Sequence, residues 1–140
     1  MIALDTNVIS ELMRASPSGR VLSWLDATPL SSIYVTTITE AEVLAGVMLL
    51  PRGKRRDAIA AAAAAMFERF GSRVLPFDRD AARAYADIVA TRRRSGRPIS
   101  AFDAQIAAIV RSVGATLATR NLTDFVGCDV DLIDPWRPPA

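Results

Sequence analysis

Short apolar runs alternate with stretches of helical periodicity along the whole chain. Strands are predicted where β-branched or apolar residues run together, over residues 1–4, 32–38, 73–77, 115–119 and 130–134. Helices are predicted where apolar residues recur every three or four positions, from about Val8 and over residues 18–27, 39–50, 54–70, 78–94 and 100–113. Helices that alternate with strands indicate an α/β protein with a parallel sheet covered on both faces. No linker or repeat interrupts the pattern, so we expect residues 1–140 to form a single domain.

Composition places the chain among globular proteins. Of its 140 residues, 51% are hydrophobic and 23% are charged. No apolar stretch approaches the ~20 residues of a membrane span, and no secretory signal opens the sequence. The single cysteine, Cys128, cannot form an internal disulfide and suits a reducing compartment. We therefore expect a cytoplasmic protein.

Two features of the composition narrow the chemistry. The chain contains no histidine, which excludes Ser-His-Asp and Cys-His catalysis and any zinc site that needs imidazole. Of the 17 basic residues, all but Lys54 are arginine, whose planar guanidinium suits phosphate recognition. A coding preference for arginine explains the same count, so this feature gives only weak support for a nucleic-acid partner.

Two acidic residues lie near predicted strand ends, where ligands gather in open α/β sheets. Asp5 directly follows the first strand, although it could simply cap the next helix. Glu42 follows Thr39 by three residues, which fits a capping box. One turn later lies Gly46, which leaves room for a close approach beside Glu42.

A third acid, Asp103, lies at the start of the helix over residues 100–113. With Ser100 it also fits a capping box. Its helix face carries core-like residues, however, and a carboxylate there needs a cation or hydrogen-bond donors nearby. Those residues are Ile106, Ala107 and Val110.

The segment TRNLTDF follows the fourth predicted strand. It brings Thr119, Asn121 and Asp124 to the same sheet edge, although it could be an ordinary polar turn. Three later acids are expected to be ordinary surface residues: Asp129, Asp131 and Asp134. Oxygen ligands without histidine or cysteine select Mg²⁺ or Mn²⁺. The shared placement of the acids therefore favours metal-dependent hydrolysis of a phosphodiester.

The chain resembles the PIN-domain ribonucleases, and among them the VapC-type toxins of toxin–antitoxin pairs, particularly the FitB-like branch. The similar segments occur in family order across nearly the whole chain: LDTNVISEL, TITEAEVLAGV with LPRGKRR after it, FDAQIAAI, LATRNLTDF and DPW. The resemblance implies a three-layer α/β/α sandwich with a parallel sheet and an acidic pocket that binds Mg²⁺ or Mn²⁺.

The resemblance also implies residue roles. Asp5 and Asp103 match the principal metal ligands. Glu42 matches the third family acid, which binds metal directly or through water, or orients the attacking water. Many relatives carry an acid at the position of Asn121, and a second acid often stands at the place of Asp124. The amide of Asn121 adds no charge, so either residue could fill the fourth position, and a second metal should bind weakly.

Further positions follow from the same resemblance. Thr6 and Thr119 would assist the metal site through their hydroxyl groups. The substrate would be RNA, and contacts to its phosphates are expected from arginines. One candidate cluster is Arg92, Arg93, Arg94 and Arg97; the other lies within residues 52–56. A solvated helix end is the alternative explanation of each cluster.

A cognate antitoxin and a homodimer are the partners that the resemblance implies, with Trp24, Leu49 and Leu50 as interface candidates. Two other functions would also use acids at strand ends. A phosphatase with Asp5 as nucleophile would usually carry an acid at the position of Asn7. A receiver-like or nucleic-acid-binding module would bind Mg²⁺ without hydrolysis, but a receiver needs a lysine near the last strands, which this chain lacks.

Overall fold

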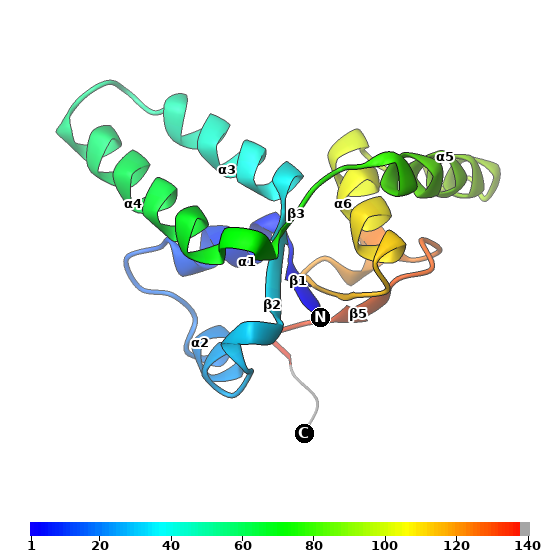
Figure 1. Cartoon of the computed structure of the whole chain (residues 1–140), viewed down its shortest axis with the longest axis horizontal. Coiled ribbons are helices and arrows are strands. Elements are labelled where there is room, and N and C mark those ends of the chain that lie inside the picture. The colour runs from blue at the N-terminus through cyan, green and yellow to red at the C-terminus, as the bar shows by residue number, and fades with distance from the viewer. Residues whose placement is uncertain (138–140) are drawn as a thin grey trace.

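The computed structural model describes residues 1–137, which fold around one parallel sheet (Figure 1). Its strands are β1 (Ile2–Leu4), β2 (Ile33–Thr36), β3 (Val74–Leu75), β4 (Thr116–Ala118) and β5 (Asp131–Ile133). All neighbouring strands are parallel, and their order is β3-β2-β1-β4-β5. Each predicted strand is therefore present, in a shorter form than its apolar run.

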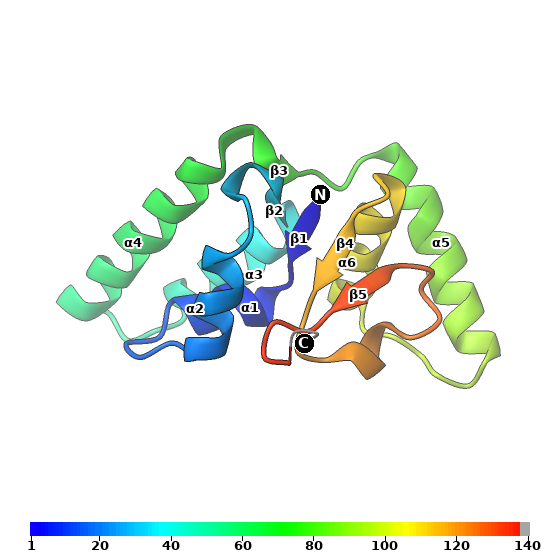
Figure 2. The ribbon, with the colours of Figure 1, turned by 90° about the horizontal axis from the view of Figure 1, so that it is seen from below.

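Helices cover both faces of the sheet. They are α1 (Thr6–Leu12), α2 (Gly19–Asp26), α3 (Thr37–Met48), α4 (Lys54–Phe70), α5 (Arg79–Arg94) and α6 (Ala101–Ser112). Short 3-10 helices are η1 (Leu30–Ser32), η2 (Gly71–Arg73) and η3 (Leu122–Phe125). Figure 2 shows α1 to α4 on one side of the sheet and α5 and α6 on the other. The predicted α/β/α sandwich is confirmed.

Side chains alternate between two cores because successive strand residues point to opposite faces. Ala3 and Leu117 pack with α5 and α6. Leu4 and Ala118 pack with α1 to α4. The central strands are thus buried on both faces, which explains why their sequences read as continuous apolar runs rather than alternating ones.

The strand order creates a switch point beside β1. The chain builds β2 and β3 on one side of β1, and then returns to place β4 on its other side. The segments that leave the carboxyl ends of β1 and β4 therefore diverge, and this divergence is where ligands bind in open α/β sheets. Asp5 and Thr119 are the first residues beyond these two strands.

The second predicted strand, residues 32–38, extends too far. Thr37 and Ile38 belong to α3, because the hydroxyl of Thr36 accepts a hydrogen bond from the Thr39 N–H at 3.1 Å and caps the helix. Their β-branched side chains favour a strand, but tertiary packing overrides this local preference. Likewise, the first helix begins at Thr6 rather than near Val8. No helix in the described part of the chain has the length and apolar character needed to cross a membrane.

Candidate active site

Asp5 lies between the two central strands and is held by the chain on both sides. Its backbone N–H donates to the carbonyl of Ala118 at 2.9 Å, which continues the β1–β4 pairing by one residue. Its Oδ1 accepts from the Thr6 N–H, and its Oδ2 accepts from the Thr119 hydroxyl, both at 2.8 Å. The side chain is only 4% exposed. Asp5 is therefore both the N-cap of α1 and a buried carboxylate in a fixed orientation.

The electrostatic environment of Asp5 favours a cation. Burial raises the pKa of Asp5 to about 6, against the lowering effect of the hydrogen bonds from Thr119 and Thr6. The charges of Asp103 and Glu42 raise this pKa further. Two further carboxyl groups thus act on Asp5. A bound cation would offset both this repulsion and the cost of burying the charge of Asp5.

Glu42 reaches the same place from α3. The Thr6 hydroxyl donates to Glu42 Oε1 at 2.8 Å. That hydroxyl also lies 3.0 Å from the Thr39 hydroxyl, which is then the donor of the pair. The predicted Thr39–Glu42 capping box is wrong: Thr36 is the N-cap, and Glu42 lies in the second turn of α3. Its carboxylate is therefore not used by the helix end.

Asp103 enters from the first turn of α6. The Ser100 hydroxyl accepts from the Asp103 N–H at 3.2 Å, so Ser100 is the N-cap, as predicted. The predicted apolar face is also confirmed, because Ile106, Ala107 and Val110 are fully buried. Burial raises the pKa of Asp103, the Ser100 hydrogen bond lowers it, the Asp124 charge raises it and Arg92 lowers it.

A cavity of about 500 Å³ joins these three acids. Its lining residues are Asp5, Thr6, Asn7, Ser10, Glu11, Arg14, Glu42, Asp103, Arg120, Asn121 and Trp136. Of the residues predicted for the site, Thr119 lies behind this lining and Asp124 lies outside it. Thr119 is fully buried, and Asp124 is exposed on η3, where its charge still affects Asp103.

Thr119 organises one wall of the cavity. While its hydroxyl donates to Asp5, its oxygen accepts from the Asn121 N–H at 3.1 Å and from Asn7 Nδ2 at 3.3 Å. This single hydroxyl therefore connects Asn7, at the start of α1, with the loop after β4. It also fixes the position of Asn121 beside the acids.

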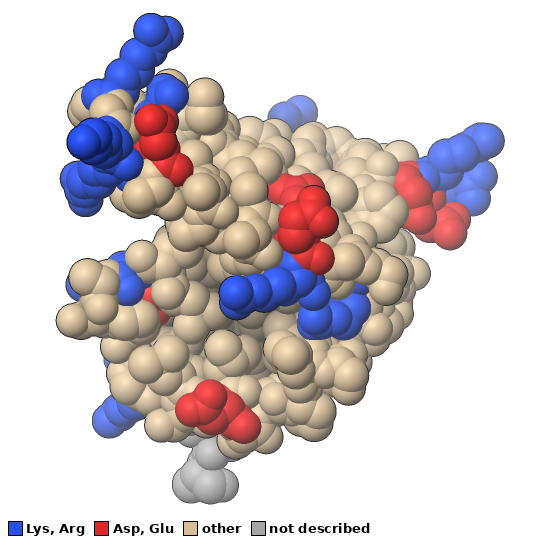
Figure 3. Space-filling model, turned by 60° about the vertical axis from the view of Figure 1, so that its left-hand side comes forward, with Lys and Arg blue, Asp and Glu red and all other residues tan. Residues whose placement is uncertain are grey.

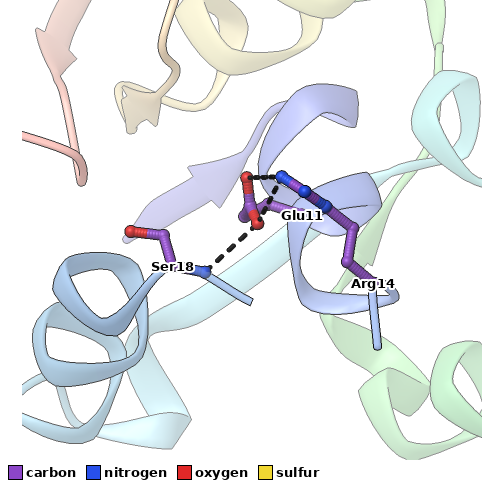
Figure 4. Close-up of polar contacts among 3 residues, drawn as sticks. All are labelled: Glu11, Arg14 and Ser18. Atoms are coloured by element: carbon purple, nitrogen blue, oxygen red, sulfur yellow. Dashed lines mark hydrogen bonds and ion pairs between the residues drawn. The ribbon is translucent and has the colours of Figure 1, made fainter. Parts of the chain in front are cut away.

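Glu11 is a fourth acid of the cavity, and the sequence analysis missed it. It is 6% exposed and accepts hydrogen bonds from Arg14 Nη1 at 3.4 Å and from the Ser18 N–H at 3.2 Å (Figure 4). The available signal was its place one helical turn after Asn7, another residue that lines the cavity. Glu11 holds the beginning of α2 against α1.

Arg92 is a correction to the predicted RNA contacts. It is 5% exposed, and its guanidinium donates to the backbone carbonyls of Arg97, Asp124 and Val126 at 2.6, 2.7 and 2.8 Å. A phosphate cannot reach it, because these bonds and the surrounding core enclose it. A sequence signal existed, since Arg92 lies one turn after the buried Ile88 on the same face of α5.

The remaining arginines of the two clusters are on the surface, except Arg56, which is partly buried. Arg93, Arg94 and Arg97 are exposed at the end of α5, and none of them lines the acidic cavity. Figure 3 shows basic side chains gathered at one corner of the molecule, at the connection from α3 to α4. The exposed basic residues there are Arg52, Lys54 and Arg55.

The donor set of the cavity fits a hard divalent cation. It offers carboxylate, amide and hydroxyl oxygens, which are the ligands that Mg²⁺ and Mn²⁺ prefer. Within residues 1–137, no three His, Cys, Asp or Glu side chains are grouped closely enough to hold a metal by themselves. Thr119, after β4, holds Asp5, and Thr6, in α1, holds Glu42. Acids that are not grouped tightly suit Mg²⁺, because this ion usually keeps several of its water ligands.

Comparisons with known proteins identify the family of the chain. The PIN domain family matches residues 2–125. The chain is 42% identical over 139 residues to VapC ribonuclease Y4jK of Sinorhizobium fredii, covering 99% of each chain. It is 40% identical over 138 residues to Toxin FitB of Neisseria gonorrhoeae, covering 98% of this chain and 99% of that one.

A solved structure shows the same arrangement of elements. In the structure of FitAB bound to an IR36 DNA fragment, one chain superposes with a TM-score of 0.94 and 39% identity, over 100% of this chain and 99% of that chain. The match to the family model extends from β1 to the end of η3, which includes the segments carrying Asp5, Glu42, Asp103 and Asn121. The chain therefore belongs to the PIN-domain family.

Proposed function

We propose that the chain is a Mg²⁺- or Mn²⁺-dependent endoribonuclease, the toxin of a VapBC-type toxin–antitoxin pair. The observation that carries this proposal is that Asp5, Glu42 and Asp103, from three separate elements, line one cavity. The possible metal ligands of that cavity are oxygen atoms. The similarity to proteins named VapC ribonuclease and Toxin FitB supports the reaction class. The free, buried Cys128 is compatible with a reducing cytoplasm.

The proposed roles of the residues are those that the family resemblance implies. Asp5 and Asp103 would be the principal metal ligands, and Glu42 a third acid that acts directly or through water. Asn121 lines the cavity and Asp124 lies outside it, so Asn121 is the better placed of the two for the fourth position. A bound cation would lower the pKa of a water molecule and stabilise the negative charge that develops on the phosphodiester.

The chain's own residues orient these acids. Thr119 and the Thr6 N–H occupy one oxygen each of Asp5, so that carboxylate cannot rotate freely. The Thr6 hydroxyl engages only Oε1 of Glu42, and Oε2 makes no hydrogen bond within residues 1–137. Because the chain has no histidine, a carboxylate must accept the proton that the attacking water releases, and Oε2 of Glu42 is available for it.

A cognate antitoxin and a second copy of the chain are the proposed protein partners. The structures of FitAB and of VapBC from Salmonella typhimurium, the latter 25% identical to this chain with a TM-score of 0.77, support partners of this kind. Leu49 is 85% exposed at the end of α3, as an interface residue should be. Trp24 is only 9% exposed and packs in a core cluster, but it also lines a cavity beside α2, so it stays an interface candidate. Leu50 is partly buried, in a groove between α1 and α3.

The test is cleavage of end-labelled RNA by the purified protein, freed of any partner, with Mg²⁺, with Mn²⁺ and with EDTA. Asp103→Asn, purified in the same way, controls for contaminating nucleases. We expect cleavage that requires the metal and is absent from Asp103→Asn. Cleavage at full rate in EDTA would contradict the metal mechanism. Binding of RNA in Mg²⁺ without cleavage would instead indicate a non-hydrolytic nucleic-acid-binding module.

A further inference from the structure

An arginine and a tryptophan stack on each other in the lining of the acidic cavity. The guanidinium carbon of Arg120 lies 5.0 Å from the centre of the Trp136 ring. Both residues line the cavity that holds Asp5, Glu42 and Asp103. Neither residue has a part in holding the metal, so the stack is a separate feature of the cavity.

Local hydrogen bonds fix the stack in place. The Asp134 side chain accepts from the backbone N–H of Trp136 at 2.9 Å, so the turn after β5 fixes the backbone at Trp136. Asp134 was expected to be an ordinary surface acid, and this contact gives it a structural role. Arg20 Nη1 lies 3.4 Å from the Trp136 carbonyl oxygen. On the other side, the Arg120 N–H donates to Asn7 Oδ1 at 3.4 Å.

Arg120 also differs from the other cation of the cavity in its charge balance. Arg14 is paired with Glu11 at 3.4 Å. Arg120 makes no ion pair with any carboxylate in residues 1–137, and its side chain is exposed. A phosphodiester that approaches a group of carboxylates meets repulsion, and an unpaired guanidinium beside it offsets that repulsion.

We propose that the Arg120–Trp136 stack binds the nucleotide next to the scissile phosphate of a single-stranded RNA. Arg120 contacts a phosphate, and the unstacked base packs on the planar surface that Arg120 and Trp136 present. Bases in single strands and loops can stack on aromatic rings and guanidinium planes, whereas paired bases in a duplex cannot. This inference rests on the proposed ribonuclease activity and adds two residues that bind its RNA substrate.

The first test uses the emission of Trp136. The assay uses Asp103→Asn, so that the RNA stays intact, in Mg²⁺ buffer with a single-stranded oligoribonucleotide and then with the same RNA in a duplex. The other tryptophan, Trp24, does not line this cavity but lines a neighbouring one with Arg20 and Arg137, so a variant that keeps only Trp24 measures its share of the signal. We expect quenching by the single strand, little by the duplex, and none when Trp136→Phe is added and only Trp24 remains.

The second test separates charge from stacking. In the otherwise unchanged protein, Arg120→Gln should raise KM for single-stranded RNA about tenfold with a smaller change in kcat, since one base stack or phosphate contact is worth this much. The slope of log affinity against log salt should fall by about one. Arg120→Lys should restore the salt slope but not the full affinity. Arg79→Gln, at an exposed arginine of α5 outside the cavity and outside both candidate RNA-contact clusters, is the matched control.

Some outcomes would overturn the inference. Equal effects of Arg120→Gln and Arg79→Gln would show a diffuse electrostatic attraction, and equal quenching by duplex RNA would remove the preference for single strands. Arg120 is on the surface, so its substitution tests the idea without unfolding the protein. If the wild type binds and is quenched without cleaving, the proposed function fails alone. If it cleaves while Arg120→Gln behaves as wild type, only this inference fails.

Discussion

The hydroxyl of Thr6 donates a hydrogen bond of 2.8 Å to Oε1 of Glu42, across 36 positions of the sequence. The contact joins the first residue of α1 to the second turn of α3, and so connects the end of β1 to the helix after β2. Because Glu42 is not a helix cap, its carboxylate has no structural partner besides this hydroxyl within residues 1–137. The position of this carboxylate at the cavity therefore favours a chemical role for it.

Replacing Glu42 with glutamine tests that role. A glutamine oxygen can still accept from Thr6, so the free energy of unfolding should change by no more than about 1 kcal/mol. The negative charge is lost, and we expect RNA cleavage at limiting Mg²⁺ to slow by roughly 10²–10³. The measurements are cleavage rate against Mg²⁺ concentration and thermal unfolding.

Glu40→Gln is a matched control for Glu42→Gln. Glu40 lies on the same helix but lines a different cavity, between α3 and α4. The Glu40→Gln variant should cleave RNA as fast as the wild type. Wild-type cleavage by Glu42→Gln would leave only Asp5, Asp103 and the loop after β4 as the catalytic site.

Asp103→Asn should abolish cleavage while leaving the fold as stable as wild type or slightly more so. Burial and the Asp124 charge both raise the pKa of Asp103, so the neutral amide removes an unfavourable charge when no metal is present. The Ser100 cap uses the Asp103 backbone N–H and survives the change. Asp80→Asn, at an exposed acid of α5, is the control. Loss of activity through unfolding, seen in a melting curve, would argue against a ligand role.

Acidic pH should stabilise the metal-free protein. The pKa of Asp5 is about 6 in the folded state against an ordinary value of 3.8, so the folded protein binds this proton more tightly than the unfolded chain. The free energy of unfolding should then rise as the pH falls through about 6, and Asp5 would contribute about 1 kcal/mol between about pH 7 and pH 5.

Urea unfolding in EDTA at both pH values measures this effect. Asp5→Asn has no proton to bind at this position and should lose that part of the pH dependence. With saturating Mg²⁺ the trend should reverse, because protons compete with the cation for the same oxygens. A wild type and an Asp5→Asn variant with identical pH profiles in EDTA would contradict the raised pKa.

Arg92 should be critical for stability although it lies outside the cavity. Arg92→Met leaves the carbonyls of Arg97, Asp124 and Val126 without their donor, and we expect a loss of more than about 3 kcal/mol. Arg92→Lys keeps the charge but lacks the planar fork, so it should recover only part of this loss.

Hydrogen exchange provides a local measure of the same clamp. In Arg92→Lys, amides of residues 121–128 should exchange faster, because the guanidinium ties that loop to α5. Arg93→Met, at the exposed neighbour, should change the free energy of unfolding by no more than about 0.5 kcal/mol. Unchanged exchange in the loop of Arg92→Lys would mean that other contacts hold it.

The element order could be predicted from the sequence because periodicity reports burial residue by residue. The helix over residues 54–70 was predicted with its observed bounds, and Gly71 ends it at a φ of 51° that suits glycine. The strand order could not be read in this way. It depends on which apolar faces meet, and no local pattern encodes that choice.

The site, like the fold, was predicted only in part. The sequence predicted Asp5 and Glu42 near strand ends and Asp103 at the start of a helix, and all three line the cavity, although the capping assignment of Glu42 was wrong. It could not bring Arg120 and Trp136 together, because only the return of the chain through β5 makes them neighbours. It also treated Arg92 as one of four equivalent arginines, although only the position facing α6 and the loop after β4 becomes buried.

The late position of β4 has a consequence for synthesis on the ribosome. Thr119, which holds Asp5, follows a strand that starts at Thr116, so the nascent chain carries β1, α1 and α3 long before their partner exists. At roughly 5–20 residues per second, several seconds separate the emergence of these segments. The cavity cannot close until β4 and Thr119 have left the exit tunnel. An enzyme that cuts RNA would therefore stay inert beside its own messenger until that segment has emerged.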